Sequence, residues 1–228
     1  MKGRKGAVKI FVETLEDKAL ELRIIDKPLP KNGEAQINNA LVKIVGEKEP
    51  EPDPSAVFVV HGRNIQAREA LFTFLRSIGL HPLEWSEIVK ATNEGSPYVS
   101  QILEKAFSTA QAAIILMTPD DEARLSEPFR KPDDPSYETQ LTPQARPNVI
   151  FEAGMAMGLY PKRTIIVELG VVRPFSDIAG RHILRMDNST EKRQELADRL
   201  RTIGCAVNLS GTDWQSAGNL TIQQPFTR

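Results

Sequence analysis

The sequence predicts an α/β domain in which a five-stranded parallel sheet carries helices on both faces. After residue 55, short apolar runs alternate with segments of helical periodicity, a pattern typical of parallel sheets. The run at 56–60 (AVFVV) is apolar throughout, as expected for a strand buried on both faces. Right-handed crossovers between five such strands favour the flavodoxin-like strand order 2-1-3-4-5.

Five apolar runs account for the predicted strands. They are residues 56–60, 80–85, 111–117, 163–169 and 183–186. Two connections are predicted to be loops, at 86–96 and 122–145, and residues 176–180 a turn or short helix. The segment 122–145 is rich in proline and acidic residues and is long for a connection, which is typical of functional loops.

Local cues set the ends of the predicted helices. Asn64 is placed to cap a helix over 65–78, and Gly79 to end it. Ser96 and Pro97 predict the N-cap and first position of the next helix. A last helix over 189–203 is capped by Ser189 or Asn188 and closed by Gly204.

The chain is predicted to divide near residues 49–55, an acidic stretch rich in proline that reads as a linker. Residues 1–48 contain three strand-like pieces and form a small β-rich segment, too short to hold a substantial core alone. The main domain covers 56–207. The tail, 208–228, contains Trp214 and Phe226 and is expected either to pack back on the domain or to be disordered.

Composition excludes several classes of protein. The 228 residues have a formal net charge of -1, so there is no basic field of the kind that marks a nucleic-acid binder. The single cysteine, Cys205, excludes an internal disulfide or a cysteine-based zinc site and is expected in the core. Without an apolar signal core or a run of about 18 apolar residues, a cytoplasmic protein is expected, without membrane contact.

The stretch 146–158 (RPNVIFEAGMAMG) predicts the start of a helix with one carboxylate, Glu152, in an apolar turn. Pro147 suits the first turn, and Asn148 is an alternative cap. A lone acid among apolar residues is costly to bury unless it has a partner or a task. The simpler alternative is that Glu152 lies on the solvent side of an amphipathic helix.

The predicted strand order brings several loops to one edge of the sheet. The segments 61–64 (HGRN), 86–96 and 118–121 (TPDD) follow the first three strands, and ligands of such sheets bind at the carboxyl ends of the strands. No P-loop, G-x-G-x-x-G or G-x-S-x-G motif occurs, and the three histidines are too widely spaced for a zinc site. A carboxylate beside phosphate-attracting helix N-termini suits cleavage of an N-glycosidic bond in a nucleotide, whose transition state resembles an oxocarbenium ion.

These motifs carry a family resemblance. The runs at 56–64, 115–121 (ILMTPDD), 146–158 and 176–180 (SDIAG) resemble bacterial TIR-like domains, the effectors of cyclic-nucleotide-based anti-phage systems. The resemblance covers about residues 56–207. It implies a TIR fold and an NAD⁺ glycohydrolase with Glu152 as the catalytic residue, which takes NAD⁺ as substrate and needs no cofactor or metal.

The resemblance also implies self-association. The loop at 86–96 is expected to change shape on assembly, and active sites to be shared between neighbouring protomers. The lengths flanking the TIR-like part leave no room for a full cyclic-nucleotide sensor, so the trigger stays open. We expect residues 1–50 to serve interaction with a protein partner rather than catalysis.

Seven further residues are candidates for substrate binding: His61, Gly62, Arg63, Trp85, Asp120, Arg146 and Asn148. Each has a structural alternative. His61 can cap the end of its strand, Asp120 can cap a helix, and Trp85 can pack in the core rather than stack on a base. Arg63 can be a surface charge, and Arg146 can pair with Glu152, hold a phosphate or form an ordinary surface ion pair.

Two other functions remain open. The protein can be a non-catalytic module that binds a nucleotide or assembles through TIR contacts. It can also be a nucleoside deoxyribosyltransferase-like enzyme, since that class uses a carboxylate near a ribose on a related fold. The first alternative predicts no dependence on the Glu152 carboxylate, and the second predicts transfer between bases and nucleosides.

Overall fold

The computed structural model describes residues 51–175, 178 and 180–221. The predicted β-rich segment at 1–48, most of the turn at 176–180 and Phe226 lie outside the described residues. The domain boundaries at residues 48, 55 and 207 therefore stay predictions.

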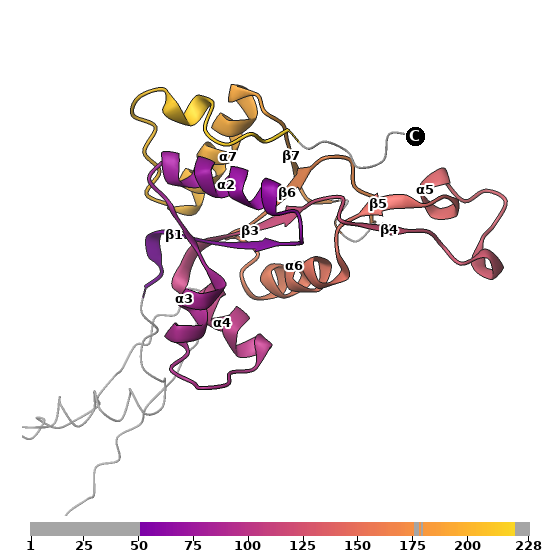
Figure 1. The fold of residues 1–228 in the computed structure, drawn as a ribbon, viewed down its shortest axis with the longest axis horizontal. Coiled ribbons are helices and arrows are strands. Elements are labelled where there is room, and N and C mark those ends of the chain that lie inside the picture. Colours follow the sequence, from indigo (N-terminus) through magenta and orange to yellow (C-terminus); the bar gives the residue numbers. More distant parts are fainter. Residues whose placement is uncertain (1–50, 176–177, 179, 222–228) are drawn as a thin grey trace, which may run out of the picture. The chain divides into compact units, whose positions relative to one another are not determined.

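Five parallel strands form the central sheet, in the order β2-β1-β3-β6-β7 (Figure 1). They are β1 (Asp53–His61), β2 (His81–Leu83), β3 (Ala110–Met117), β6 (Thr164–Leu169) and β7 (Leu184–Met186). The sheet and its order confirm the predicted fold. Residues 56–60 of β1 are buried, because the strand lies inside the sheet with helices on both sides.

Helices cover both faces of the sheet (Figure 1). One face carries α2 (Ile65–Ser77) and α7 (Thr190–Ile203), whose buried residues share a core with alternate residues of β1 and β3. The other carries α3 (Trp85–Ala91), α4 (Val99–Thr109) and α6 (Pro147–Leu159). The buried side chains of the strands divide between these two cores, since successive side chains of a strand point to opposite faces.

Most predicted helix ends are confirmed. The Asn64 side chain accepts a hydrogen bond of 3.0 Å from the Ala67 N–H at the start of α2. The Ser189 hydroxyl accepts one of 3.3 Å from the Lys192 N–H at the start of α7. Gly204 closes α7 with a φ of 99°, a left-handed conformation that glycine adopts without a steric penalty.

Two predictions between β2 and β3 were wrong. The predicted loop at 86–96 contains α3, because Trp85, Ile88 and Val89 recur at helical spacing and the Glu87 carboxylate accepts a 2.9 Å hydrogen bond from the Glu84 N–H. Helix α4 begins at Val99 rather than after Ser96. The Gln101 side chain accepts a 2.7 Å hydrogen bond from the Tyr98 N–H, so Tyr98 takes the capping position.

The predicted long loop at 122–145 is instead an arm that projects from the body (Figure 1). Strands β4 (Asp121–Ala123) and β5 (Thr142–Gln144) pair antiparallel. A 3₁₀ turn, η1 (Glu127–Phe129), and a short helix, α5 (Ser136–Thr139), lie beyond them. No residue of 121–144 is buried, which explains why the segment lacks a hydrophobic period in the sequence.

The described part of the tail packs back on the domain. It includes η3 (Asp213–Gln215), and Trp214 and Leu220 are buried in the same core as α2 and α7. The fully buried Arg193 of α7 holds this segment, donating hydrogen bonds to the carbonyl oxygens of Ala217 (3.2 Å) and Gly218. Cys205 is buried as predicted, and burial raises the pKa of its thiol to about 11.

None of the described helices has the length and apolar character needed to cross a bilayer.

Candidate functional site

The candidate site lies where the chain changes direction in the sheet. From β1 the chain passes to β2 on one side, and from β3 it passes to β6 on the other. The carboxyl ends of two such strands enclose a crevice that commonly binds ligands. His61 of β1 pairs with Leu116 of β3, so the segments 61–64 and 118–121 leave the sheet next to each other.

Asp120 joins these two segments. One carboxylate oxygen, Oδ2, accepts hydrogen bonds from the backbone N–H groups of Arg63 (2.6 Å) and Asn64 (3.3 Å). The carboxylate also lies against Gly62, where a Cβ atom would come within 1.9 Å of Oδ2. The other oxygen, Oδ1, is buried and has no hydrogen-bond partner in the described part of the chain.

We expect Asp120→Ala to loosen the loop after β1. Two backbone N–H groups lose a charged acceptor, and because both are at least partly open to water the combined cost is roughly 1–2 kcal/mol. The melting temperature should fall by about 3–8 °C, which differential scanning calorimetry would measure. Asp121→Ala is the matched control, since Asp121 has only a distant, part-exposed ion pair with Arg146. Equal melting temperatures for the wild type and Asp120→Ala would contradict this role.

Glu152 lies on the flank of α6. Val149, Ala153 and Ala156 face the sheet, and Glu152 is half-buried beside them. Its carboxylate makes no hydrogen bond or ion pair with any described residue. Burial raises the pKa of this carboxyl above its usual value. Glu152 is therefore neither fully solvated nor neutralised by a partner.

Helical geometry shows which way this flank faces. Helix α6 contacts β1, β3 and β6. Ile150 lines a pocket together with Glu168 and Phe175 from the β6 side. Residues two apart on a helix lie about 200° apart around its axis, so Glu152 is on the opposite flank, on the β1 side of α6.

The raised pKa of Glu152 predicts that Glu152→Gln is more stable than the wild type at neutral pH. A folded pKa above the unfolded value of about 4.3 means that ionised Glu152 destabilises the fold once the pH exceeds both values. The gain should be near zero below the unfolded pKa and complete above the folded pKa. We expect the melting temperature to rise by about 1–3 °C at pH 7, measured from pH 3 to 8. Glu122→Gln on the arm is the control, and a gain independent of pH would contradict the assignment.

Some of the other predicted site residues lie together at the end of β1, and the others do not. Gly62, Arg63 and Asp120 come together as described, and His61 joins them with its Nδ1 2.9 Å from the Gly62 carbonyl oxygen. The Arg146 Nε lies 3.9 Å from the Asp121 carboxylate, which is the ion-pair alternative, and the alternative pairing with Glu152 is wrong. Asn148 is exposed in the first turn of α6, whose N-cap is Arg146.

Trp85 differs from its expected place. Strand β2 ends at Leu83, and Trp85 begins α3 with 45% of its surface exposed. The alternative in which this ring packs in the core is therefore wrong, because a helix start replaces the last residues of the predicted strand, and its contact with a base stays a prediction.

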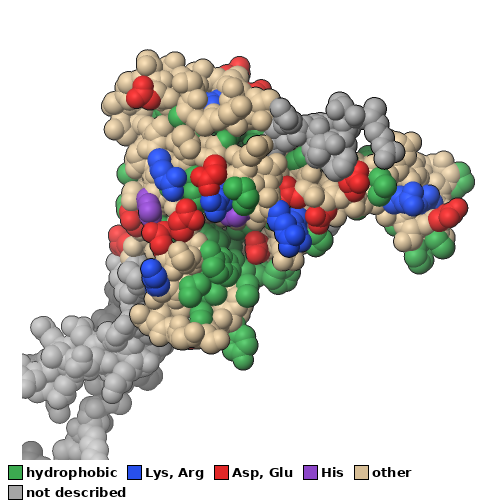
Figure 2. All heavy atoms as spheres, viewed as in Figure 1, with side chains coloured by type: hydrophobic (Ala, Val, Ile, Leu, Met, Phe, Trp, Pro, Cys, Tyr) green, Lys and Arg blue, Asp and Glu red, His purple; other side chains and the backbone are tan. Residues whose placement is uncertain are grey.

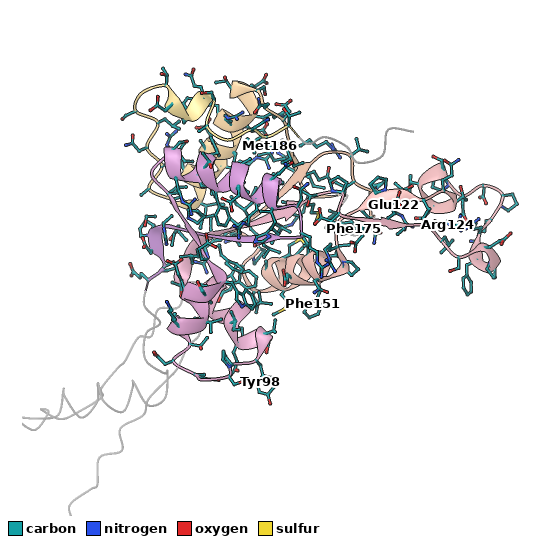
Figure 3. The ribbon with its side chains drawn as sticks, in the orientation of Figure 1. Tyr98, Glu122, Arg124, Phe151, Phe175 and Met186 are labelled. Carbon is teal, nitrogen blue, oxygen red and sulfur yellow. The ribbon has the colours of Figure 1, made fainter. Side chains whose placement is uncertain are left out.

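Sequence reasoning missed an exposed apolar face beside Glu152. Figure 2 shows hydrophobic side chains gathered over α6 and the start of α4. They include Phe151 and Tyr98, which are 68% and 78% exposed and point outward in Figure 3. The apolar residues of α6 that do not fit its buried stripe are the sequence feature that indicates this face.

Comparison with known proteins identifies the family. Residues 56–188 match the model of the CAP12/Pycsar effector protein, TIR domain. The chain belongs to this TIR-domain family. It is 32% identical over 110 residues to Protein tirC of Dictyostelium discoideum, covering 48% of this chain and 50% of that protein. It is 26% identical over 166 residues to the uncharacterized protein YuaY of Escherichia coli K12, covering 69% of this chain and 51% of that protein.

The chain thus spans about half the length of these curated relatives. The family match covers β1 to β7 and includes Glu152, Asp120 and the loop after β1. The arm at 121–144 lies inside the matched TIR domain. In the described ranges, no group of three or more histidine, cysteine or acidic side chains is placed to hold a metal ion.

Proposed function

We propose that this TIR-domain protein is an NAD⁺ glycohydrolase that releases nicotinamide and leaves ADP-ribose or a cyclic form of it. The observation that carries the proposal is Glu152, a half-buried carboxylate on the β1 side of α6 that has no hydrogen-bond or ion-pair partner among the described residues. An ionised carboxylate in such a place attracts a developing positive charge more strongly than one in water.

The chemistry breaks the bond between the ribose C1′ and the nicotinamide nitrogen. The bonding electrons leave with nicotinamide, which departs as a neutral molecule, and the ribose acquires oxocarbenium character. Glu152 stabilises this charge. Attack on C1′ by water, with loss of a proton, gives ADP-ribose, whereas attack by a nucleophilic atom of the adenine gives a cyclic product.

Other residues of the crevice suit substrate positioning. The buried Asp120 Oδ1 can accept a hydrogen bond from a ribose hydroxyl, which would satisfy an oxygen that lacks a partner. Arg63 and Arg146 flank the same segments and supply positive charge for the pyrophosphate.

We further propose that activity depends on self-association and serves anti-phage or stress defence, as the family description of an effector suggests. The exposed Phe151, which precedes Glu152 in α6, and the exposed Tyr98 at the start of α4 offer an apolar surface for a neighbouring protomer. That surface also supports the main alternative, a TIR–TIR interaction module without catalysis.

The test is nicotinamide release from NAD⁺ across a range of protein concentrations with a crowding agent, monitored beside sedimentation velocity. Turnover that rises with the assembled fraction supports the proposal. An assembled protein that leaves NAD⁺ intact would favour the interaction module. Exchange of free bases between deoxynucleosides, without NAD⁺ loss, would identify a deoxyribosyltransferase-like enzyme.

A further inference from the structure

A second pocket lies on the far side of α6 from Glu152. It has a volume of about 280 Å³ and opens at the carboxyl ends of β3 and β6. Its walls come from Ile150 of α6, the base of the arm and residues 172–175. Figure 3 labels Phe175 where the arm leaves the body. The volume suits a small ring system with a sugar and is too small for a whole dinucleotide.

The sheet register places a charged group in this pocket. Met117 of β3, Glu168 of β6 and Arg185 of β7 are paired residues on three adjacent strands. Met117 and Glu168 both line the pocket. The Glu168 side chain is only 12% exposed, and the Nε of Arg185, which is 79% exposed, lies 3.1 Å from its Oε2. The carboxylate therefore keeps unused acceptor capacity, since its two oxygens offer about four lone-pair sites.

Arg173, which supplies the guanidinium group in the described lining of the pocket, already has an ion-pair partner. Arg173 forms an ion pair with Glu138, and both side chains are largely buried. The backbone N–H of Arg173 also donates a 2.6 Å hydrogen bond to the Pro143 carbonyl oxygen at the foot of the arm. Among the described residues, the lining thus presents one arginine and two carboxylates, each of which has an arginine partner. A phosphate or carboxylate ligand is disfavoured there, because the described lining offers no cation that is free to pair with it.

Most of the remaining lining residues are apolar, and Gln144 adds one amide group. Phe175 and Tyr137 supply aromatic rings, and Met117 and Ile150 supply aliphatic surface. Aromatic faces bind planar rings by stacking. A planar ligand with N–H donors at one edge would combine stacking with a charge-assisted hydrogen bond to Glu168.

We propose that this pocket binds an amino-substituted nucleobase as its nucleoside, with the exocyclic amine donating to the Glu168 carboxylate. The proposal does not depend on NAD⁺ cleavage. Its ligand chemistry has two sources, a separate nucleoside or the adenosine end of a dinucleotide.

The test is equilibrium binding of adenosine, cytidine and guanosine to the full chain, measured by isothermal titration and ligand-observed NMR. At least one should bind, and Glu168→Met should weaken that binding by roughly 10–100-fold, the value of a hydrogen bond to a charged group. Arg185→Gln is the matched control, because it removes only the exposed ion-pair partner and should change affinity less than about 3-fold. Purine riboside, which lacks the amine, should bind as weakly to wild type as adenosine binds to Glu168→Met.

A second variant keeps the test valid if Glu168→Met does not fold. Phe175→Ala removes an aromatic ring of the lining without changing Glu168 and should weaken binding about 10-fold or more. No binding at millimolar nucleoside, or binding that neither variant changes, would overturn the proposal. NAD⁺ added to Glu152→Gln protein then identifies the source: displacement of the nucleoside indicates the adenosine end of the substrate, and simultaneous binding indicates a separate ligand.

Discussion

Glu152→Gln is expected to lower the rate of nicotinamide release by about 10²–10³-fold or more, with little change in KM. The amide keeps the size of the side chain but removes the negative charge that the proposed transition state requires. Loss of one preorganised electrostatic contact of this kind costs about 3–4 kcal/mol of transition-state stabilisation. An equal fall in kcat and kcat/KM would show that the contact acts only in the transition state.

Two controls make this result specific. Glu152→Asp retains the charge on a shorter stem and should recover part of the activity. Glu122→Gln removes an exposed carboxylate from the arm and should behave as wild type. Equal turnover by the wild type and Glu152→Gln would remove Glu152 from the mechanism.

Arg193→Ala is expected to give the largest loss of stability. The guanidinium is fully buried and donates to the Asn188 carbonyl oxygen (2.7 Å), the Asn188 side chain (2.9 Å) and the carbonyl oxygens of Ala217 and Gly218. Removing it leaves these acceptors unsatisfied and opens a cavity between α7 and the tail. The expected cost is about 3–5 kcal/mol, or a fall in melting temperature of about 8–15 °C.

The matched control is Arg201→Ala, which truncates an arginine of the same helix whose side chain is 51% exposed. Its melting temperature should change by less than about 2 °C. Thermal unfolding followed by circular dichroism distinguishes the two. A small effect of Arg193→Ala would mean that the tail contributes little to the fold.

The sheet was predictable because its strands are short apolar runs with distinct breaks. Residues 56–60 and 111–117 are apolar over most of their length, and burial on both faces allows few other structures. Helix α7 was predictable for a similar reason, since Ser189 and Gly204 mark both ends.

The parts that sequence reasoning missed depend on partners distant in the chain. Arg193 reads as an exposed charge in its helix until the tail, 24 residues later, folds over it. The pocket beside Glu168 combines two neighbouring strands, α6, the arm and a loop. The periodicity of a single sequence does not show which distant segments come into contact. The proximity of Gly62 and Asp120 could be predicted only because the strand order places the ends of β1 and β3 next to each other.

The arm has a consequence for how the chain tolerates change. It leaves and re-enters the body at a paired position, Asp121 opposite Gln144, so its two ends stay together whatever lies between them. Its outer residues bury nothing, and length variation there costs only loop-closure entropy, which grows slowly with length. Insertions and deletions should therefore accumulate between residues 124 and 136. The segment from α5 to β5, where Glu138 meets Arg173, should keep its length.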